Sequence, residues 1–168
     1  DLVAAAQTWP ASPIKIVVPS APGTQSDIVA RVLAQRLSPV LGQPVLIDNK
    51  PGADGMLAVE AVVSAPADGY TLVNVQSGSL TIAPTLYPTR IRYDPERDLL
   101  PITYTVKATF ILTVAATSSV RDIKSFVAYS KANPKQAAIG HMPGAAYLGA
   151  LVFRAVSTAD SELIPYKG

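Results

Sequence analysis

The chain has 168 residues, of which 49% are hydrophobic and 15% are charged, and its net charge is +2. This composition supplies the core of one ordinary domain or of two small lobes, and it differs from that of a disordered chain. Because the 14 basic residues are scattered and nearly balanced by 12 acidic ones, we exclude nucleic acid as a partner.

The residue inventory also limits the possible chemistry. The chain has no cysteine and a single histidine, His141, which excludes disulfides, thiolate zinc sites and a site built from several histidines. We therefore expect no metal and no cofactor. No apolar run approaches the roughly 18 residues that cross a membrane. The segment Ala4 to Ala6 resembles the end of a secretory signal whose charged and apolar parts are missing, although a tag remnant or frayed terminus fits equally well.

The first hundred residues begin with a strand pattern and a helix pattern. The β-branched run Ile14 to Val18 lies between two prolines and predicts a buried strand. Thr24 precedes Asp27 by three residues, which is the spacing of a helix capping box. Apolar residues then recur at helical spacing until Pro39 and Gly42, which are expected to end the helix. These apolar residues are Ile28, Val32, Leu33 and Leu37.

The alternation continues along the chain. Strand patterns occupy Val45 to Ile47 and Tyr70 to Val75, and a helix pattern lies between them at Met56 to Val63. The order strand, helix, strand, helix, strand predicts a parallel sheet with right-handed crossovers. Residues 87–101 are rich in proline and charge, which is typical of a bridge between lobes.

A second α/β run follows this bridge and repeats the design of the first without obvious identity. Its predicted strands and helices are Phe110 to Ala115, Val120 to Ala132, Ala137 to Ile139, Ala145 to Val156, and Leu163 to Ile164. We predict two α/β lobes, residues 1–100 and 101–168, with a ligand cleft between them.

Ligands of open parallel sheets bind beyond the carboxyl ends of the strands. Four loops occupy this position in the predicted lobes, namely residues 19–26, 51–55, 76–79 and 140–144. All except the third clearly open a helix, so unpaired N–H groups and a partial positive charge would favour a carboxylate or phosphate there. Each loop also fits an ordinary turn, and Thr24, Asp27 and Asp54 also fit helix caps, so both interpretations remain open.

Motifs of enzymes are missing from the sequence. There is no nucleophile elbow, no nucleotide phosphate loop and no dinucleotide fingerprint after the first strand. A Ser-His-Asp arrangement would depend entirely on His141, which we interpret as a loop residue. We therefore predict no catalytic residue.

Several short motifs occur in the order found in one known family. They are WPASPIKIVVPSAPGTQSDIVARVLAQRL, LGQPVLIDNKPGADG, PADGYTLV, SGSLTIAPTLYP, YDPERDLLPIT and PYKG. From Trp9 to Gly168 the chain resembles the Bug/TctC family of periplasmic solute-binding proteins, the extracytoplasmic receptors of tripartite tricarboxylate transporters. The resemblance implies a non-enzymatic receptor of type II periplasmic-binding-protein-like α/β fold. Its two lobes would close on a small carboxylate, and its partners would be the membrane components of the transporter.

The same resemblance implies particular ligand contacts through backbone amides, hydroxyls and bridging waters. In the first lobe the matching positions are Ser20, Ala21, Gly23, Thr24, Asp27, Gly52, Ala53, Gly55, Ser77 and Ser79. In the second lobe they are Gly144, Ala145, Ala146, Tyr166, Lys167 and Gly168. The implied location is the periplasm, reached by a signal peptide that is largely absent from this chain.

The sequence departs from the family pattern at three loops. Thr24 and Asp54 replace usual glycines, and the helix start at Gly144 to Ala146 has lost its usual hydroxyls. Fewer donors at that helix favour a monocarboxylate with an apolar tail over a dicarboxylate. Family members continue well beyond the PYKG motif, so we expect a truncated chain in which the second half of the usual fold is missing.

A chain truncated in this way would expose sheet edges and apolar faces, which predicts self-association. Two alternatives to the receptor remain. One is an α/β enzyme that acts on a small anion, and the other is a truncated fragment that binds nothing.

Overall fold

The computed structural model describes residues 9–134, 136–142 and 144–166. The chain divides into two compact units between Lys107 and Ala108. The boundary expected after residue 100 remains a prediction. The signal-like segment Ala4 to Ala6, together with Lys167 and Gly168, lies outside the described residues.

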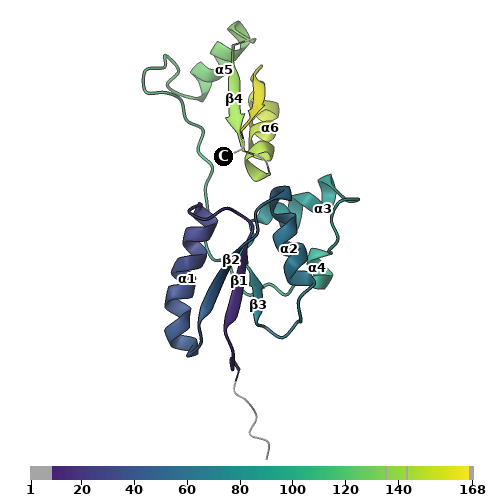
Figure 1. Cartoon of the computed structure of the whole chain (residues 1–168). Helices are drawn as coiled ribbons and strands as arrows, with labels where there is room; N and C mark the ends of the chain where they lie inside the picture. Colours follow the sequence, from purple (N-terminus) through teal and green to yellow (C-terminus); the bar gives the residue numbers. More distant parts are fainter. Residues whose placement is uncertain (1–8, 135, 143, 167–168) are drawn as a thin grey trace, which may run out of the picture. The chain divides into compact units, whose positions relative to one another are not determined.

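The first unit contains a three-stranded parallel sheet in the order β2-β1-β3, as the alternation of strand and helix patterns predicts. Its strands are β1 Ile14–Val18, β2 Val45–Asn49 and β3 Thr71–Val73. Since the chain moves from β1 to β2 and then back past β1 to β3, right-handed crossovers place the two connecting helices on opposite faces. Figure 1 shows these helices, α1 Gln25–Leu41 and α2 Met56–Val63, on opposite sides of the sheet.

Helix α1 packs on the sheet through small residues. Ala30 and Ala34 are buried against β1 and β2, whereas Ile28 and Val32 are 53% and 52% exposed. The alanines allow the helix backbone to approach the strands closely, so the larger residues of the predicted apolar pattern lie beside the contact. The prediction that Pro39 ends the helix is wrong, because α1 continues to Leu41 and ends at Gly42 in the left-handed conformation.

The opposite face of the sheet is covered by α2 and by short helical segments that follow β3. Figure 1 shows α3 Ala83–Leu86 and α4 Pro95–Asp98 on the same side as α2. The buried residues Met56, Val59, Ala83 and Tyr93 form a second core there. This packing fixes the segment that follows β3 against the start of α2.

The second unit contains a two-stranded parallel sheet. Its elements are α5 Ile123–Ala132, β4 Ala138–His141, α6 Ala145–Ser157 and β5 Glu162–Pro165. A capping box between Asp122 and Ser125 begins α5, which therefore starts later than Val120. Phe126 and Ile139 lie in the core of this unit, together with Ala150 of α6.

The strand predicted at Phe110 to Ala115 is not present. Residues 110–115 are all described, and they form neither helix nor strand, with Phe110 and Ile111 66% and 79% exposed. The β-branched and aromatic composition favours a strand, but a strand also needs a neighbour that accepts its backbone hydrogen bonds. The segment has the strand pattern without that neighbour.

Candidate functional site

The carboxyl ends of three parallel strands bring three loops of the first unit to one edge of the sheet. The strand order reverses between β1 and β3, and this switch point is where open α/β sheets bind ligands. Two amide side chains that follow β3 tie the first turn of α1 to this point. Asn74 Nδ2 donates to the Ser26 carbonyl and Gln76 Nε2 donates to Ser26 Oγ, both at 3.1 Å.

The first loop leaves the start of α1 without a side-chain cap. Thr24 is the N-cap residue, but its hydroxyl donates to the Ala21 carbonyl at 2.9 Å and lies 2.6 Å from Ser20 Oγ. The predicted capping box is therefore wrong, because the hydroxyl is used within the loop. The first N–H groups of α1 have no intrahelical partner by geometry, so they can donate to a bound anion.

Asp27 holds the first loop in place from inside the protein. It is only 2% exposed, and Oδ2 accepts from Gly23 N and Arg31 Nε, both at 2.8 Å. Oδ1 accepts from Asn49 Nδ2 at 2.9 Å. The hydrogen bond from Arg31, followed by those from Gly23 and Asn49, holds the pKa of the Asp27 carboxyl well below its usual range. Asp27 thus links α1, the first loop and the end of β2 as a carboxylate.

The second loop has an unusual backbone. Gly52, Ala53, Asp54 and Gly55 all have positive φ, at 121°, 47°, 52° and 86°. A residue other than glycine in this region costs about 1–3 kcal/mol and persists only where its surroundings enforce it. Asp54 is expected from its position to cap a helix, but the N-cap of α2 is Gly55, and no side chain caps it.

Contacts at Gly55 enforce this conformation and bring the three loops together. A Cβ at Gly55 would lie 2.6 Å from Ser79 Oγ and 3.1 Å from Pro19 Cβ. Ser79 Oγ donates to the Asp54 carbonyl at 2.8 Å, and the buried Tyr93 hydroxyl donates to the Ser79 carbonyl at 2.6 Å. Gly55 is therefore the point at which the loops after β1, β2 and β3 meet.

The third loop, whose sequence does not clearly indicate a helix start, also opens a helical segment. Ser77 is the N-cap of a π-helical turn at Gly78–Ile82 that continues into α3. Its carbonyl accepts from Thr81 Oγ1 at 2.9 Å. All three loops of this edge therefore lead into helical N–H groups.

Burial divides the predicted contacts of the first unit into two groups. Asp27, Gly55 and Ser79 are buried and position the loops. The remaining residues are exposed or partly exposed and are available to a ligand. They are Ser20, Ala21, Gly23, Thr24, Gly52, Ala53 and Ser77.

Sequence reasoning missed the side chains that tie the loops together. Asn49, Asn74 and Gln76 are amide residues at or just beyond the ends of strands, and Tyr93 lies in a segment whose composition indicates a bridge. Polar amides at the carboxyl ends of β2 and β3, the strands on either side of β1, were the available signal. Tyr93 gave no such signal, because its contact with Ser79 depends on packing against α2 and α3.

The carboxyl edge of the second unit has a different character. Gly144, with a φ of 79°, is the N-cap of α6, and no side chain caps this helix. Ala145 and Ala146 are partly buried at its start, and Tyr166 follows β5 at the same edge. The other two predicted contacts, Lys167 and Gly168, lie outside the described residues.

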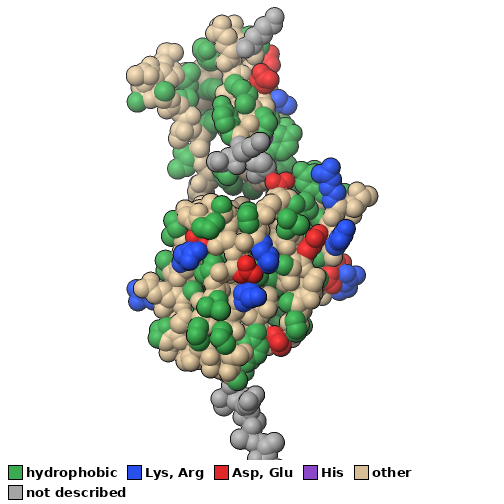
Figure 2. Space-filling model, viewed as in Figure 1, with side chains coloured by type: hydrophobic (Ala, Val, Ile, Leu, Met, Phe, Trp, Pro, Cys, Tyr) green, Lys and Arg blue, Asp and Glu red, His purple; other side chains and the backbone are tan. Residues whose placement is uncertain are grey.

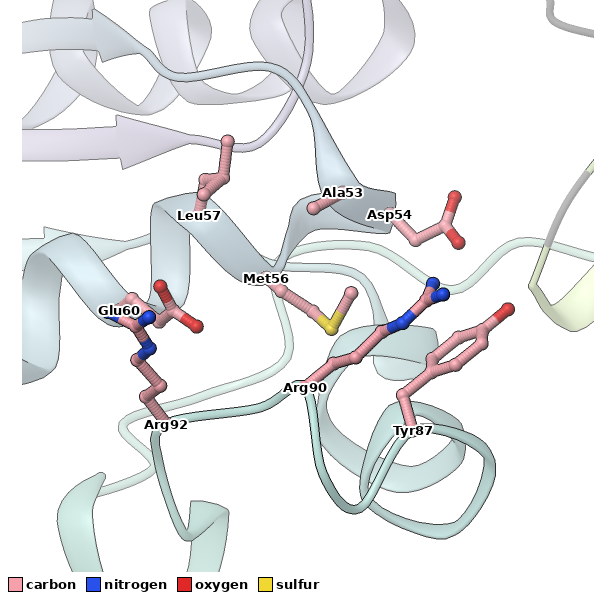
Figure 3. Close-up of a pocket in the computed structure, with 8 residues that line it drawn as sticks. All are labelled: Ala53, Asp54, Met56, Leu57, Glu60, Tyr87, Arg90 and Arg92. Carbon is pink, nitrogen blue, oxygen red and sulfur yellow. The ribbon is translucent and has the colours of Figure 1, made fainter.

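A pocket of about 400 Å³ opens beside the second loop of the first unit. Figure 3 shows Arg92 pointing toward Glu60, and Arg90 lying along Tyr87, whose ring centre is 5.6 Å from the guanidinium carbon. Acidic and basic side chains thus face one another around it. The pocket is lined by Ala53, Asp54, Met56, Leu57, Glu60, Tyr87, Arg90 and Arg92.

Other kinds of site find no support in the described part of the chain. Residues 9–134, 136–142 and 144–166 contain no group of three or more metal-ligating side chains placed to hold an ion. No helix among them has the length and hydropathy needed to cross a bilayer. Figure 2 shows basic and acidic side chains interspersed on the viewed face of the first unit, without a field of one sign. In parallel α/β units of this kind, the loops at the carboxyl ends of the strands are the place where small ligands bind.

Comparison with known proteins gives the family. Residues 29–168 match the family described as tripartite tricarboxylate transporter family receptor, TctC, and the chain belongs to this family. It is similar to a UPF0065 protein of Bordetella bronchiseptica, with 40% identity over 154 residues that cover 92% of this chain and 45% of that protein. The chain spans about half the length of the curated relatives it matches.

Two similar solved structures carry ligands in their descriptions. One is R. palustris Rpa4515 with adipate, at 27% identity and a TM-score of 0.76, with 95% of this chain and 54% of that chain covered. The other is MatC from Rhodopseudomonas palustris with bound malate, at 27% identity and a TM-score of 0.72, with 95% and 55% covered. The family match confirms the resemblance, and similarity to solved periplasmic proteins, among them a periplasmic binding protein, confirms the α/β periplasmic-binding-protein fold. The family is one of transport receptors and not of enzymes.

Proposed function

We propose that this chain binds a small organic carboxylate as part of a periplasmic solute receptor. The receptor would deliver the carboxylate to the membrane components of a tripartite tricarboxylate-type transporter, after secretion directed by a signal peptide. Closure of two lobes on the ligand would be the change that the membrane partner detects. Gly144, Ala145, Ala146 and Tyr166 would contribute contacts from the second unit, as would Lys167 and Gly168.

The observation that carries this proposal is the uncapped start of α1 at the switch point of the sheet. The Thr24 hydroxyl is used within its own loop, and Asn74 and Gln76 hold the first helical turn at the carboxyl ends of β1 and β3. Unpaired helical N–H groups in a fixed position stabilise an anion without a basic side chain. Adipate and malate in the two similar structures are anions of this kind.

A calorimetric and thermal-shift screen of C3–C6 monocarboxylates and dicarboxylates, acidic amino acids and aromatic acids tests the proposal. A ligand present at 100 times its dissociation constant should stabilise the folded protein by about 2.7 kcal/mol. The methyl ester of each acid is the matched control, because it keeps the carbon skeleton and removes the charge. We expect the acids to bind and the esters to produce no shift.

A pair of serine variants locates the binding edge. Ser77 is exposed in the third loop, whereas Ser64 follows the far end of α2 and bonds to the Glu60 carbonyl. Removing a hydroxyl that donates to a carboxylate should weaken binding by about tenfold, so we expect this loss for Ser77→Ala and none for Ser64→Ala. If no acid binds the folded chain, it is a non-binding fragment, and turnover of a bound acid would instead identify an enzyme.

A further inference from the structure

Asn74 joins the start of α1 to the chain segment that contains Thr105. It follows β3 directly, and its backbone N–H donates to the Val17 carbonyl at 2.9 Å, which extends the pairing of β3 with β1. Its side-chain Nδ2 donates to the Ser26 carbonyl in the first turn of α1, and its Oδ1 accepts from Thr105 Oγ1, both at 3.1 Å. Both ends of this one amide group are therefore in use.

The chemistry of the groups fixes the direction of these two hydrogen bonds. A carbonyl oxygen only accepts, so the amide nitrogen of Asn74 has to face Ser26, and the amide oxygen accepts from the Thr105 hydroxyl. The peptide group that carries the Ser26 carbonyl also carries the Asp27 N–H. Asp27 is the third residue of α1, and the N–H groups of the first turn have no intrahelical partner.

These groups form a row in which every hydrogen bond runs in one direction. The row passes from the Thr105 hydroxyl through the Asn74 amide to the peptide group between Ser26 and Asp27. In such a row each hydrogen bond polarises the next, so a bond made at one end strengthens the bond at the other. A carboxylate that accepts from the Asp27 N–H would complete the row.

The far end of the row lies in an exposed segment that leads from the first unit to the second. We call residues 100–114 the exit segment; the unit boundary lies within it, between Lys107 and Ala108. All of its residues are exposed, and they form neither helix nor strand. Among the hydrogen bonds between described residues, the one from Thr105 to Asn74 is the only one that the exit segment makes.

We propose that Thr105 is a positioning residue for the bound carboxylate, and that the carboxylate in turn strengthens the attachment of the exit segment to the first unit. This inference rests on the proposed function, which places the carboxylate at the start of α1. Without the Thr105 hydroxyl the Asn74 amide is held at one end only, so the first turn of α1 is fixed less firmly. Because coupling between two sites is reciprocal, the carboxylate should strengthen the bond from Thr105 by the same factor.

Calorimetry on the 168-residue chain measures the effect of Thr105 on affinity, with the C3–C6 carboxylates of the screen above as probes, adipate and malate first. Thr105→Val removes the hydroxyl, keeps the shape of the side chain and should weaken binding about threefold. Thr105→Ser restores the hydroxyl and should bind as wild type does. Thr103→Val is the matched control and should bind as wild type does, because Thr103 lies in the exit segment and makes no hydrogen bond with a described residue.

A double-mutant cycle tests whether Thr105 acts through Asn74. Asn74→Ala breaks the row, so adding Thr105→Val to that variant should not weaken binding further. If the losses of the two single variants multiply in the double variant, Thr105 acts by another route and the proposal is wrong. Equal affinity of wild type and Thr105→Val also contradicts it.

Limited proteolysis tests the reciprocal effect. Trypsin cleaves after Lys107, which is exposed in the exit segment, and cleavage after Arg121 provides the comparison in the same sample. A saturating acid should slow the cut after Lys107 about threefold more in wild type and Thr105→Ser than in Thr105→Val. Equal slowing in all three proteins overturns the inference while the receptor function stands, whereas failure of every acid to bind overturns both.

Discussion

The carboxyl edges of the two sheets are built differently although both follow parallel strands and lead into helices. In the first unit, buried polar groups join the loops, with Asp27 accepting three hydrogen bonds and Ser79 bonding to Asp54. In the second unit, the described contacts at the edge are mainly between rings and backbone, as at Tyr166 and Gly140. Hydrogen bonds fix the direction of backbone groups, whereas an exposed ring can turn to suit a ligand. The loops of the first unit are therefore held more firmly than the exposed ring of the second unit.

The strongest effect should come from a methyl group at the point where the first unit's loops meet. Gly55→Ala should destabilise the first unit by about 2–4 kcal/mol, because φ is 86° and the new Cβ would collide with Ser79 Oγ and Pro19 Cβ. Hydrogen exchange of the β1 amides measures this loss, and β4 amides provide the comparison in the same sample.

Two other glycines separate the causes of this effect. Gly23→Ala tests backbone strain alone, because φ is 84° and no atom lies within 4 Å of the added Cβ, and it should cost about 1 kcal/mol. Gly140→Ala should cost less, because the exposed Tyr166 ring can move away. A loss at Gly140 as large as that at Gly55 would show that the two edges are equally rigid.

The next effect depends on pH. The folded-state pKa of Asp27 lies below its value in the unfolded chain, about 3.9, so its contribution to stability is present above about pH 4 and is lost as pH falls further. Asp27→Asn should lower the melting temperature by several degrees at pH 7, and the difference from wild type should narrow toward pH 2. Thermal melts monitored by circular dichroism at a series of pH values measure this convergence.

Asp48→Asn is the control for this pH effect. The carboxylate of Asp48 lies 3.6 Å from Lys50 Nζ and is partly exposed, so its loss should change the melting temperature little. Asp98 and Asp122 also have lowered pKa values, that of Asp98 reaching about 2, so wild type and Asp27→Asn should both lose stability in acid. Parallel curves for these two proteins between pH 7 and pH 2 would contradict the role given to Asp27.

A smaller effect should come from the Tyr93 hydroxyl, which supports the third loop. Tyr93→Phe removes the buried hydroxyl that donates to the Ser79 carbonyl and should destabilise the first unit by about 1 kcal/mol. Chemical denaturation measures this change. Tyr104→Phe is the matched control, because Tyr104 is 97% exposed and should show no change. If Tyr93→Phe is as stable as Tyr104→Phe and wild type, the Tyr93 hydroxyl does not stabilise the third loop.

Two segments of similar composition show how far strand prediction from sequence can go. IKIVV at residues 14–18 becomes β1, because β2 and β3 pair with it on both sides. FILTVA at residues 110–115 has the same β-branched and apolar character and forms no strand. The side chains specify a preference for extended backbone, but pairing depends on which residues lie next to the segment in space.

The loops at the carboxyl ends of the first unit's strands show the same difference between what the sequence predicts and what the fold decides. Their positions after parallel strands follow from the order of strand and helix patterns, and this prediction is supported by the sheet topology. The roles of Thr24 and Asp27 could not be obtained in this way. Their spacing fits a capping box, whereas the Thr24 hydroxyl bonds to Ala21 within the loop and Asp27 pairs with Arg31 along α1. The bond from Asn49 to Asp27 in addition depends on how the first loop folds against β2.

Periodicity and local motifs are enough to specify the family, the parallel α/β design and the loops in which a ligand would be bound, because these features are encoded in residues close together in the chain. The folded chain is needed to distinguish loop residues that face the solvent from those that support the backbone from inside. It also shows that three loops meet at Gly55 and that Tyr166 covers Gly140. Such contacts join residues far apart in the sequence, and their geometry arises only when strands pair and helices pack on them.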